Sequence, residues 1–506
     1  MTNVVKTLKE SKSACWIAWA CLVVPMFASY FFDDMFSTIS HIFKNPEMLE
    51  LGWNTLDYGF YAGGYSFLCV WGGLIVCGML LDKWGVRVTG SIFVGLMAAG
   101  AALVYVTISS KAIVASGNSL YIAYVGCMLF GLGSEIAGVA VTRSIAKWFK
   151  GKSMALAMGL QLAIARLGTA AALLLSPVLV AESEAGYPLD VTNRPAFYGL
   201  MLLLIGAVVW AVFVAMDAKF DKQEGTSDKV VTAEEDKFKF SDIFKILGNK
   251  HYLLISLLCV FFYCCIISFK KFATAILIPR FGADAAEFEQ TASMMVSMIP
   301  FFTVVFTPLF GSLVDRIGKA TTWMITGSVM VFVAHVIIAF APGEAIFGYV
   351  GIAILGVGYS LVPAAMWPSV PKIVPEKNLG TAYSLIYWIQ NMGMMAVPII
   401  VGSILNKYSG VEAAVNAEYV FIILGIVAIT VSLLLYFSSK KNPQLNLDVP
   451  NKKEGITLYY IIPRQSIMLQ GGGFFHLYAK GHLPLLARNV SLIYLHCFLS
   501  TVFRQG

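Results

Sequence analysis

Two oppositely charged side chains lie deep inside apolar sequence, where ionised groups are costly. Glu135 lies in the apolar segment that ends near Trp148, and Arg166 lies in the next one. The chain turns between Lys150 and Gly151, midway between the two charges. At about 1.5 Å rise per residue, both charges lie roughly 20 Å from the turn, at equal height.

This pair of charges has two possible roles. Inside a bilayer, a glutamate and an arginine need partners or a polar cavity. They can form a structural ion pair that holds two helices together. Alternatively, Glu135 can bind an ammonium group while Arg166 binds a carboxylate with its planar guanidinium. The second role would make the pair a binding site for a zwitterion.

The elements that position these charges must be membrane helices. Of 506 residues, 58 % are hydrophobic and 13 % are charged, whereas soluble proteins carry about 25 % charged residues. At roughly 20 apolar residues per span, the chain has room for about a dozen helices. The predicted spans are 15–38, 55–81, 88–109, 119–148, 152–180, 196–216, 251–279, 291–313, 322–341, 346–371, 379–406 and 417–438.

The spans divide into six plus six around a polar run. We expect an N-terminal six-helix bundle over residues 1–216, a cytoplasmic linker over 217–250 and a C-terminal six-helix bundle over 251–440. Residues 441–506 differ in composition from the spans, with apolar and basic residues in alternation and a run of three glycines, and they have no counterpart in the first half. We interpret this tail as disordered or non-native sequence.

Charge in the loops predicts the orientation. Lysine and arginine gather in alternate loops, together with the region before the first span, and the other loops are acidic or mixed. Since cytoplasmic loops carry the excess of basic residues, both termini are expected in the cytoplasm. The net charge of +7 comes from these loops and does not indicate a nucleic-acid partner.

One loop pattern occurs twice in the sequence. Gly78–Arg87 and Gly311–Lys319 share the pattern Gly-x-x-x-Asp-basic-x-Gly, and their matching residues are 233 positions apart. An aspartate at a helix end can accept hydrogen bonds from the free N–H groups of a neighbouring helix. Two copies in register between long apolar segments indicate a transporter built from two repeats.

Over about residues 14–440, the chain resembles the major facilitator superfamily. Gly78–Arg87 is similar to that superfamily's signature between spans 2 and 3, and Gly311–Lys319 to its weaker copy between spans 8 and 9. The resemblance implies an all-α membrane fold of twelve helices in two pseudo-symmetric bundles. It also implies a role in gating the cytoplasmic side for the charged residues of the loops: Asp82, Arg87, Asp315 and Arg316.

The hairpin of spans 4 and 5 resembles one branch of that superfamily. Trp148–Lys152, Gly159–Leu162 and Arg166–Gly168 are similar to the lysosomal dipeptide transporters. In that branch a glutamate and an arginine at this spacing contact the peptide. The resemblance therefore implies that Glu135 and Arg166 bind a dipeptide.

Charges near the outer ends of two further spans suggest a second gate. Asp33 and Asp34 lie in span 1, and Lys270 and Lys271 lie at a similar depth in span 7, its repeat partner. We expect an acid–base pair that bridges the halves and closes the outer side; interfacial placement of these charges is the alternative. Arg143, two turns from Glu135, is expected to serve the cytoplasmic half of the path.

Span 11 carries polar and aromatic side chains suited to a cavity wall. We expect Trp388 and Asn391 to contribute to substrate binding, with core packing as the alternative. Lys270 and Lys271 are further candidates for binding, because they could join Arg166 in holding an anion.

The sequence predicts a transporter and not an enzyme. It has no Walker A motif, metal-ligand cluster or nucleophile constellation, so we expect no cofactor and no catalytic residue. The predicted function is facilitative or secondary active transport of dipeptides or similar small zwitterions by alternating access. The alternatives are an organic-anion carrier and a non-transporting nutrient sensor or accessory subunit on the same fold.

The expected partners are the substrate and the lipid bilayer, and proton coupling and an accessory membrane subunit remain open. The N-terminus lacks an acidic dileucine sorting signal. We expect a bacterial cytoplasmic membrane, with a lysosomal membrane as the alternative.

Overall fold

Long apolar helices make up nearly all of the described chain. The computed structural model describes residues 8, 10–149, 153–180, 186–225, 240–282, 285–375 and 378–450, which all belong to one unit, Met1–Lys452. Among them, twelve helical segments are long and apolar enough to cross a membrane. The predicted all-α fold with twelve spans is therefore confirmed.

The first half contains these elements: α1 (Lys12–Asp34), η1 (Ser37–Lys44), η2 (Pro46–Met48), α2 (Thr55–Leu68), η3 (Cys69–Gly73), α3 (Leu74–Ser109), α4 (Lys111–Ala115), α5 (Ser119–Trp148), α6 (Met154–Leu179), α7 (Leu189–Thr192) and α8 (Arg194–Glu224). The second half contains α9 (Phe240–Leu247), α10 (Lys250–Phe281), α11 (Ala285–Ile317), α12 (Ala320–Phe340), α13 (Ala345–Met366), η5 (Trp367–Lys372), α14 (Leu379–Lys407), α15 (Gly410–Lys441) and η7 (Pro443–Leu445).

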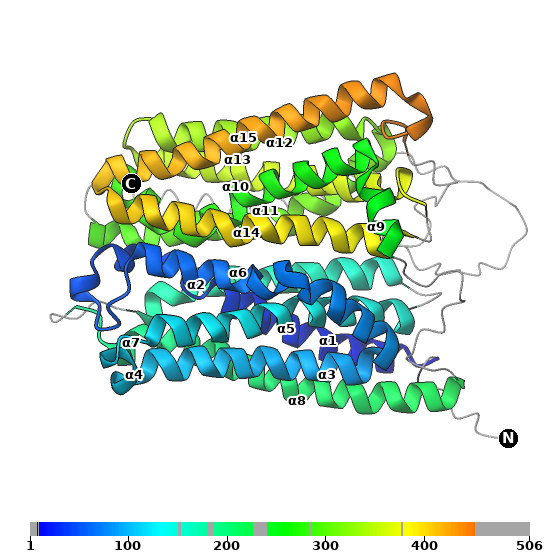
Figure 1. Cartoon of the computed structure of the whole chain (residues 1–506), viewed down its shortest axis with the longest axis horizontal. Coiled ribbons are helices and arrows are strands. Elements are labelled where there is room, and N and C mark those ends of the chain that lie inside the picture. Colours follow the sequence, from blue (N-terminus) through cyan, green and yellow to red (C-terminus); the bar gives the residue numbers. More distant parts are fainter. Residues whose placement is uncertain are drawn as a thin grey trace, which may run out of the picture. The chain divides into compact units, whose positions relative to one another are not determined.

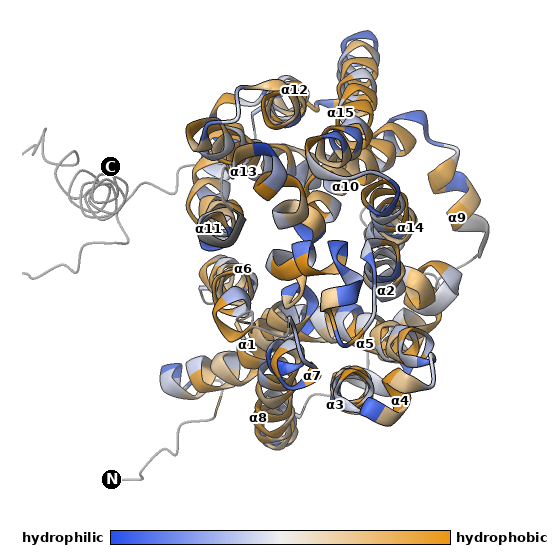
Figure 2. Cartoon of the chain, turned by 90° about the vertical axis from the view of Figure 1, so that its left-hand side faces the viewer, coloured by the Kyte–Doolittle hydropathy of each residue, from blue (hydrophilic) through white to orange (hydrophobic). Residues whose placement is uncertain are grey.

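The two halves form two bundles that lie side by side (Figure 1). Viewed end-on, α2 lies beside α14 and α6 beside α11, so the bundles meet along these helices (Figure 2). A third contact joins η1, which follows α1, to α10. Helices α1 and α10 therefore lie near the seam between the bundles, where a transport path would run.

The two ends of this assembly differ in charge. We call the end where α1 begins the basic end, and it carries Lys83, Lys147, Lys319 and Lys372. We call the opposite end the acidic end, and it carries Glu50, Asp190, Glu344 and Glu412. The expectation that the basic end faces the cytoplasm stays a prediction.

The predicted linker begins too early. Helix α8 continues to Glu224, eight residues beyond the predicted boundary at residue 216. Asp217 and Asp221 are buried in this extension, because basic side chains of the first bundle neutralise them there. A polar run that is paired in this way continues the helix instead of ending it.

The beginning of the predicted tail is also ordered. Asp448 accepts a hydrogen bond from the backbone N–H of Thr321 at 2.9 Å, and its carbonyl accepts one from the N–H of Lys319 at 2.8 Å. Lys372 donates to the carbonyl of Asn446 at 3.2 Å. Residues 442–450 therefore pack on the basic end of the second bundle, and the rest of the predicted tail lies outside the described residues.

Small residues let the bundles approach closely at the acidic end. A Cβ atom on Gly59 of α2 would lie 2.6 Å from the carbonyl oxygen of Pro398 on α14. A Cβ on Gly402 would overlap the carbonyl oxygen of Thr55, whose hydroxyl donates to the carbonyl of Gly402 at 3.1 Å. Contact between α2 and α14 in this arrangement therefore requires glycine at both positions.

Replacing Gly402 by valine should shift the population toward a state that is open at the acidic end, because the added side chain blocks the approach of α2 to α14. Labelling of cysteines introduced at the acidic end should become faster. Gly380→Val on the same helix is the matched control, since a Cβ there meets nothing within 4 Å. Equal labelling rates in the two variants would contradict this account of the contact.

Candidate functional site

Glu135 is held by polar neighbours within the first bundle. The hydroxyl of Tyr65 on α2 lies 3.2 Å from Oε1 of Glu135 and 3.2 Å from the hydroxyl of Ser134. Ser134 in turn lies 2.5 Å from the hydroxyl of Ser29 on α1. The carboxylate therefore has a hydrogen-bonding partner on a neighbouring helix, Tyr65, although it lies in the middle of α5.

Arg166 is directed toward the second bundle. Its Nη1 lies 3.5 Å from the hydroxyl of Thr307 on α11, and its guanidinium carbon lies 5.4 Å from the ring centroid of Tyr359 on α13. Cation–π contacts of this kind hold a guanidinium without neutralising its charge. The arginine therefore remains able to bind a carboxylate.

Glu135 and Arg166 do not neutralise each other. Among the contacts of the described residues, neither side chain forms an ion pair with the other. The hydroxyl of Tyr30 on α1 interacts electrostatically with both charges. This geometry favours two separate charged poles over a structural ion pair.

Tyrosines from both bundles surround these poles. Tyr387 on α14 interacts electrostatically with Glu135 and Tyr30, and its ring stacks on Trp367 at 5.2 Å. The sequence alone does not distinguish Tyr30, Tyr65 and Tyr359 from the other tyrosines of the apolar spans. A single tyrosine in an apolar span cannot be distinguished from a packing residue until its neighbours are known.

Trp388 and Asn391, which were predicted to bind substrate, both donate hydrogen bonds to backbone carbonyls. The indole N–H of Trp388 donates to the carbonyl of Val70 at 2.7 Å, which joins α14 to the π-helical turn η3. The amide of Asn391 is buried and donates to the carbonyl of Tyr387 in its own helix. Neither side chain has a described contact with the two poles, so a binding role for them stays a prediction.

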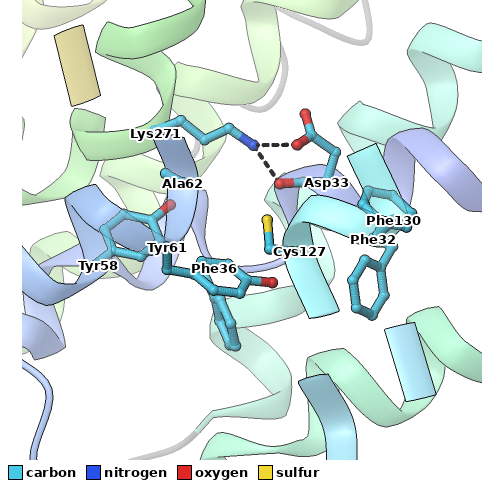
Figure 3. Close-up of a pocket in the computed structure, with 9 residues that line it drawn as sticks. All are labelled: Phe32, Asp33, Phe36, Tyr58, Tyr61, Ala62, Cys127, Phe130 and Lys271. Carbon is cyan, nitrogen blue, oxygen red and sulfur yellow. Dashed lines mark hydrogen bonds and ion pairs between the residues drawn. The ribbon is translucent and has the colours of Figure 1, made fainter. Parts of the chain in front are cut away.

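The acids of span 1 and the lysines of span 7 do meet. Nζ of Lys270 lies 2.6 Å from Oδ2 of Asp34, and Nζ of Lys271 lies 2.8 Å from Oδ1 of Asp33 and 3.4 Å from Oδ1 of Asp34. Lys271 also donates to the carbonyl of Asp33, as Figure 3 shows. Both lysines are thus paired with α1, while the described contacts of Arg166 lie on α11 and α13. Their role in gating, or in substrate binding, stays a prediction.

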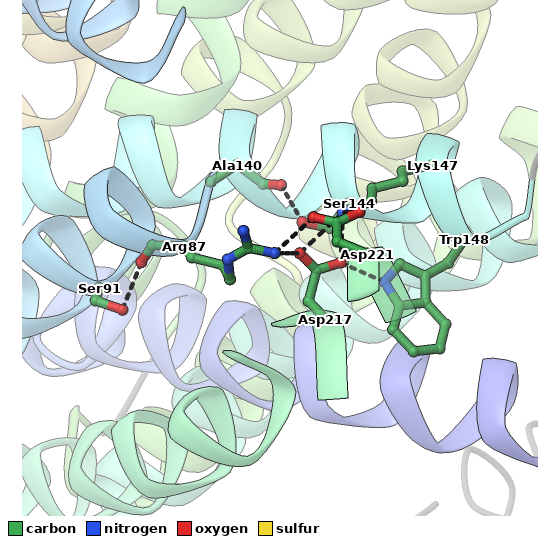
Figure 4. A network of polar contacts seen from close by, with 8 residues as sticks. All are labelled: Arg87, Ser91, Ala140, Ser144, Lys147, Trp148, Asp217 and Asp221. Atoms are coloured by element: carbon green, nitrogen blue, oxygen red, sulfur yellow. Dashed lines mark hydrogen bonds and ion pairs between the residues drawn. The ribbon is translucent and has the colours of Figure 1, made fainter. Parts of the chain in front are cut away.

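A second charge network lies at the basic end (Figure 4). Nη1 of Arg87 lies 3.0 Å from Oδ2 of Asp217 and 2.6 Å from Oδ2 of Asp221. Lys147 lies 2.9 Å and 2.8 Å from the same two carboxylates, and Trp148 donates to Asp217 at 2.8 Å. These contacts tie α3, α5 and α8 together within one bundle.

The resemblance to the superfamily implied a gating role for Arg87, whereas its two acidic partners, Asp217 and Asp221, were assigned to the linker. The spacing of four residues between Asp217 and Asp221 could have indicated a continuing helix, because it places both carboxylates on one helix face.

The remaining predicted gating residues lie near the same end. The side chain of Asp82 on α3 lies outside the described part of the chain. Asp315 is half-buried at the end of α11, Arg316 beside it is exposed, and Arg143 is half-buried on α5. Lys372 interacts electrostatically with Asp315. Their gating roles stay predictions.

Replacing Asp217 by alanine should lower the free energy of unfolding by about 3 kcal/mol, because two cations and a buried indole N–H lose a shared acceptor. The melting temperature of the detergent-purified protein measures this loss. Asp190→Ala, at an exposed position in α7, is the control and should melt like the unmodified protein. Equal melting of the two variants would show that the network does not stabilise the bundle.

Comparisons with known proteins agree with this architecture. A family model described as "Major Facilitator Superfamily" matches residues 26–368 and 266–503. The lysosomal dipeptide transporter MFSD1 of Danio rerio is 27 % identical over 442 residues, which cover 85 % of this chain and 88 % of the relative. The Homo sapiens protein of that name is also 27 % identical, over 388 residues that cover 75 % and 78 % of the two chains.

Solved structures share the fold at low sequence identity. A peptide transporter, POT, in complex with sulfate has a TM-score of 0.61 at 15 % identity, covering 84 % of this chain and 95 % of its own. A D-xylose–proton symporter has a TM-score of 0.62 at 14 % identity, covering 83 % and 97 %. The resemblance predicted from the repeated loop and the hairpin is thereby confirmed.

Proposed function

This chain belongs to the major facilitator superfamily, and we propose that it carries dipeptides or similar small zwitterions across a membrane by alternating access. Its relatives and structural neighbours are membrane transporters, so transport through a multi-pass membrane fold is the premise. The substrate and the mechanism are the proposal.

The two unneutralised poles carry this proposal. Glu135 and Arg166 lie on consecutive membrane helices, and each contacts hydroxyl or aromatic groups rather than the other. Two opposite charges in a membrane interior are costly without partners. A ligand with an ammonium and a carboxylate would neutralise both at once, and the guanidinium suits a carboxylate because it can donate two parallel hydrogen bonds.

The contacts between the bundles suggest how the site would be exposed. Ser40 contacts Thr274 at 3.0 Å, and Lys44 donates to the carbonyl of Leu405 at 2.9 Å, both near the acidic end. The pairs of Asp33 and Asp34 with the lysines of α10 lie on the same side. We infer a state that is closed at the acidic end, and rocking of the bundles would open that end and expose the site there.

The organic-anion alternative receives less support from this geometry. It requires Lys270 and Lys271 to act with Arg166, yet both ammonium groups are paired with acids of α1. A non-transporting sensor would share the same fold and the same poles, so only a transport measurement distinguishes it. Proton coupling would use Glu135, Asp33 or Asp34, whereas a uniporter needs no titrating group.

A thermal-shift screen tests the substrate class. The purified protein is heated with dipeptides, single amino acids and dicarboxylates, because a ligand that binds the folded state raises the melting temperature by mass action. We expect stabilisation by dipeptides, and at 100 times Kd this amounts to about 2.7 kcal/mol. Stabilisation by dicarboxylates alone would favour the organic-anion alternative.

The membrane in which the protein resides is part of the proposal. Its relatives named above are lysosomal transporters of animals, which supports a lysosomal location as a serious alternative to a bacterial cytoplasmic membrane.

A further inference from the structure

The two acids at the end of α1, Asp33 and Asp34, differ in burial and in the number of their polar partners. The side chain of Asp34 is 1 % exposed, and besides the lysines it accepts hydrogen bonds from Thr169 at 2.8 Å and Ser37 at 3.2 Å. The side chain of Asp33 is 28 % exposed, and among its described contacts only Lys271 is a charged partner. Asp34 is therefore a structural acid, and Asp33 retains capacity for another cation.

Asp33 also lies within electrostatic reach of the ammonium pole of the site. Phe130 lines the same cavity as Asp33, and its ring centroid lies 6.0 Å from that of Tyr65, whose hydroxyl donates to Glu135 at 3.2 Å. The carboxylate of Asp33 also interacts electrostatically with Glu135. It interacts in the same way with Tyr30, about one turn earlier on α1. Asp33 thus takes part in the ion pairs between α1 and α10 and also interacts with the surroundings of Glu135.

Little space remains beside the ion pair in the observed state. Figure 3 shows Asp33 and Lys271 at a cavity whose other walls are mostly aromatic, among them Phe36, Tyr58 and Tyr61. The cavity has a volume of about 10 Å³, close to the smallest that can hold one water molecule. At this cavity, a second cation can therefore reach Asp33 only if Lys271 moves away from it.

We propose that Asp33 is a second acid for the ammonium group of the substrate, and that Lys271 occupies it while the site is empty. This inference rests on the proposed function. The bound ammonium lies between Glu135 and Asp33 and replaces Lys271 as the partner of Asp33. Lys271 keeps Asp34 as a partner, and the pair of Lys270 with Asp34 is unchanged.

This exchange links binding to opening of the acidic end. A ligand shifts a conformational equilibrium only by its differential affinity for the two states. Since the substrate competes for one of the ion pairs that hold α1 to α10, its binding weakens the closed state by that pair alone. The pair of Asp34 with Lys270 remains, so binding favours opening of the acidic end without breaking every ion pair that holds α1 to α10.

The test measures the affinities of alanyl-alanine and of N-acetyl-alanyl-alanine, which lacks the ammonium, by titration calorimetry on the full chain. The readout is the ratio of the two affinities, because changes in fold or in conformational equilibrium affect both peptides alike. Asp33→Asn should reduce the preference for the free peptide about tenfold, the loss expected for one charged hydrogen bond. Lys271→Met removes the competitor and should increase the preference.

Asp34→Asn is the matched control, at the neighbouring position and in the same gate. It should leave the ratio unchanged even if it alters the rate of transport. An unchanged ratio in Asp33→Asn, or a reduced ratio in Lys271→Met, would overturn the inference. If the unmodified protein binds neither peptide, both the proposed function and this inference are wrong. If the preference for the free peptide is unchanged in Asp33→Asn, only this inference is wrong.

Discussion

Replacing Arg166 by alanine is expected to abolish the binding of dipeptides that have a free carboxylate, with a loss of about 100-fold or more in affinity. Each charge-assisted hydrogen bond contributes about 1.5–3 kcal/mol, and a guanidinium makes two of them to a carboxylate. Arg166→Lys should lose most of this affinity, because an ammonium group cannot make the forked contact. Titration calorimetry with the purified variants measures the loss.

A C-terminally amidated dipeptide provides the control for this experiment. It lacks the carboxylate, so its weaker binding should change little in Arg166→Ala. Thr307→Val tests whether the effect comes from contacts between the bundles, since the guanidinium lies 3.5 Å from that hydroxyl. If Arg166→Ala binds and transports free dipeptides normally, the assignment of the carboxylate pole is wrong.

The second large effect is expected at the contact between α1 and α10. Reversing one charge, in Asp34→Lys or Lys270→Asp, places like charges side by side where the two side chains are 1 % and 12 % exposed. Breaking a buried pair typically costs 3–5 kcal/mol. If that cost falls on closure of the acidic end, exchange of substrate should slow by more than about tenfold.

The double variant Asp34→Lys, Lys270→Asp separates pairing from other effects. It restores opposite charges, so it should recover part of the exchange rate. Recovery should be incomplete, because a lysine at position 34 cannot accept the hydrogen bonds of Thr169 and Ser37. Should the double variant exchange no faster than the single ones, the pair does not act as a gate. Counterflow of a labelled dipeptide measures all three variants.

Local patterns in the sequence were enough to predict the scaffold. Hydrophobic runs gave the number of spans, because a bilayer requires about 20 apolar residues for each. Depth along a helix placed the acids of span 1 level with the lysines of span 7, and these side chains do meet. Both arguments depend only on helix geometry, which a sequence specifies well.

Features that depend on tertiary contacts were missed. Asp217 and Asp221 looked like solvated linker residues, because Arg87 and Lys147, which neutralise them, are 130 and 70 positions away from Asp217. Asp448 looked like part of an unstructured tail, because its partner Thr321 is 127 positions away. Long-range pairs of this kind leave no periodic signal in the chain.

The surroundings of the two poles were missed for a related reason. Tyr30, Tyr65 and Tyr359 come from three helices, and nothing in each span alone distinguishes a tyrosine at a polar site from one in a core. Only the arrangement of the bundles brings their hydroxyl groups or rings to Glu135 and Arg166. The charges themselves were recognisable because a charge in an apolar span is costly wherever it lies.

Uptake into liposomes tests the central claim most directly. The purified chain is reconstituted, the vesicles are loaded with unlabelled alanyl-alanine, and entry of the labelled dipeptide is followed. We predict saturable uptake that unlabelled dipeptides inhibit, that a dicarboxylate does not inhibit, and that Arg166→Ala abolishes. Absence of dipeptide uptake by the folded protein, or uptake of the dicarboxylate in its place, would contradict the account.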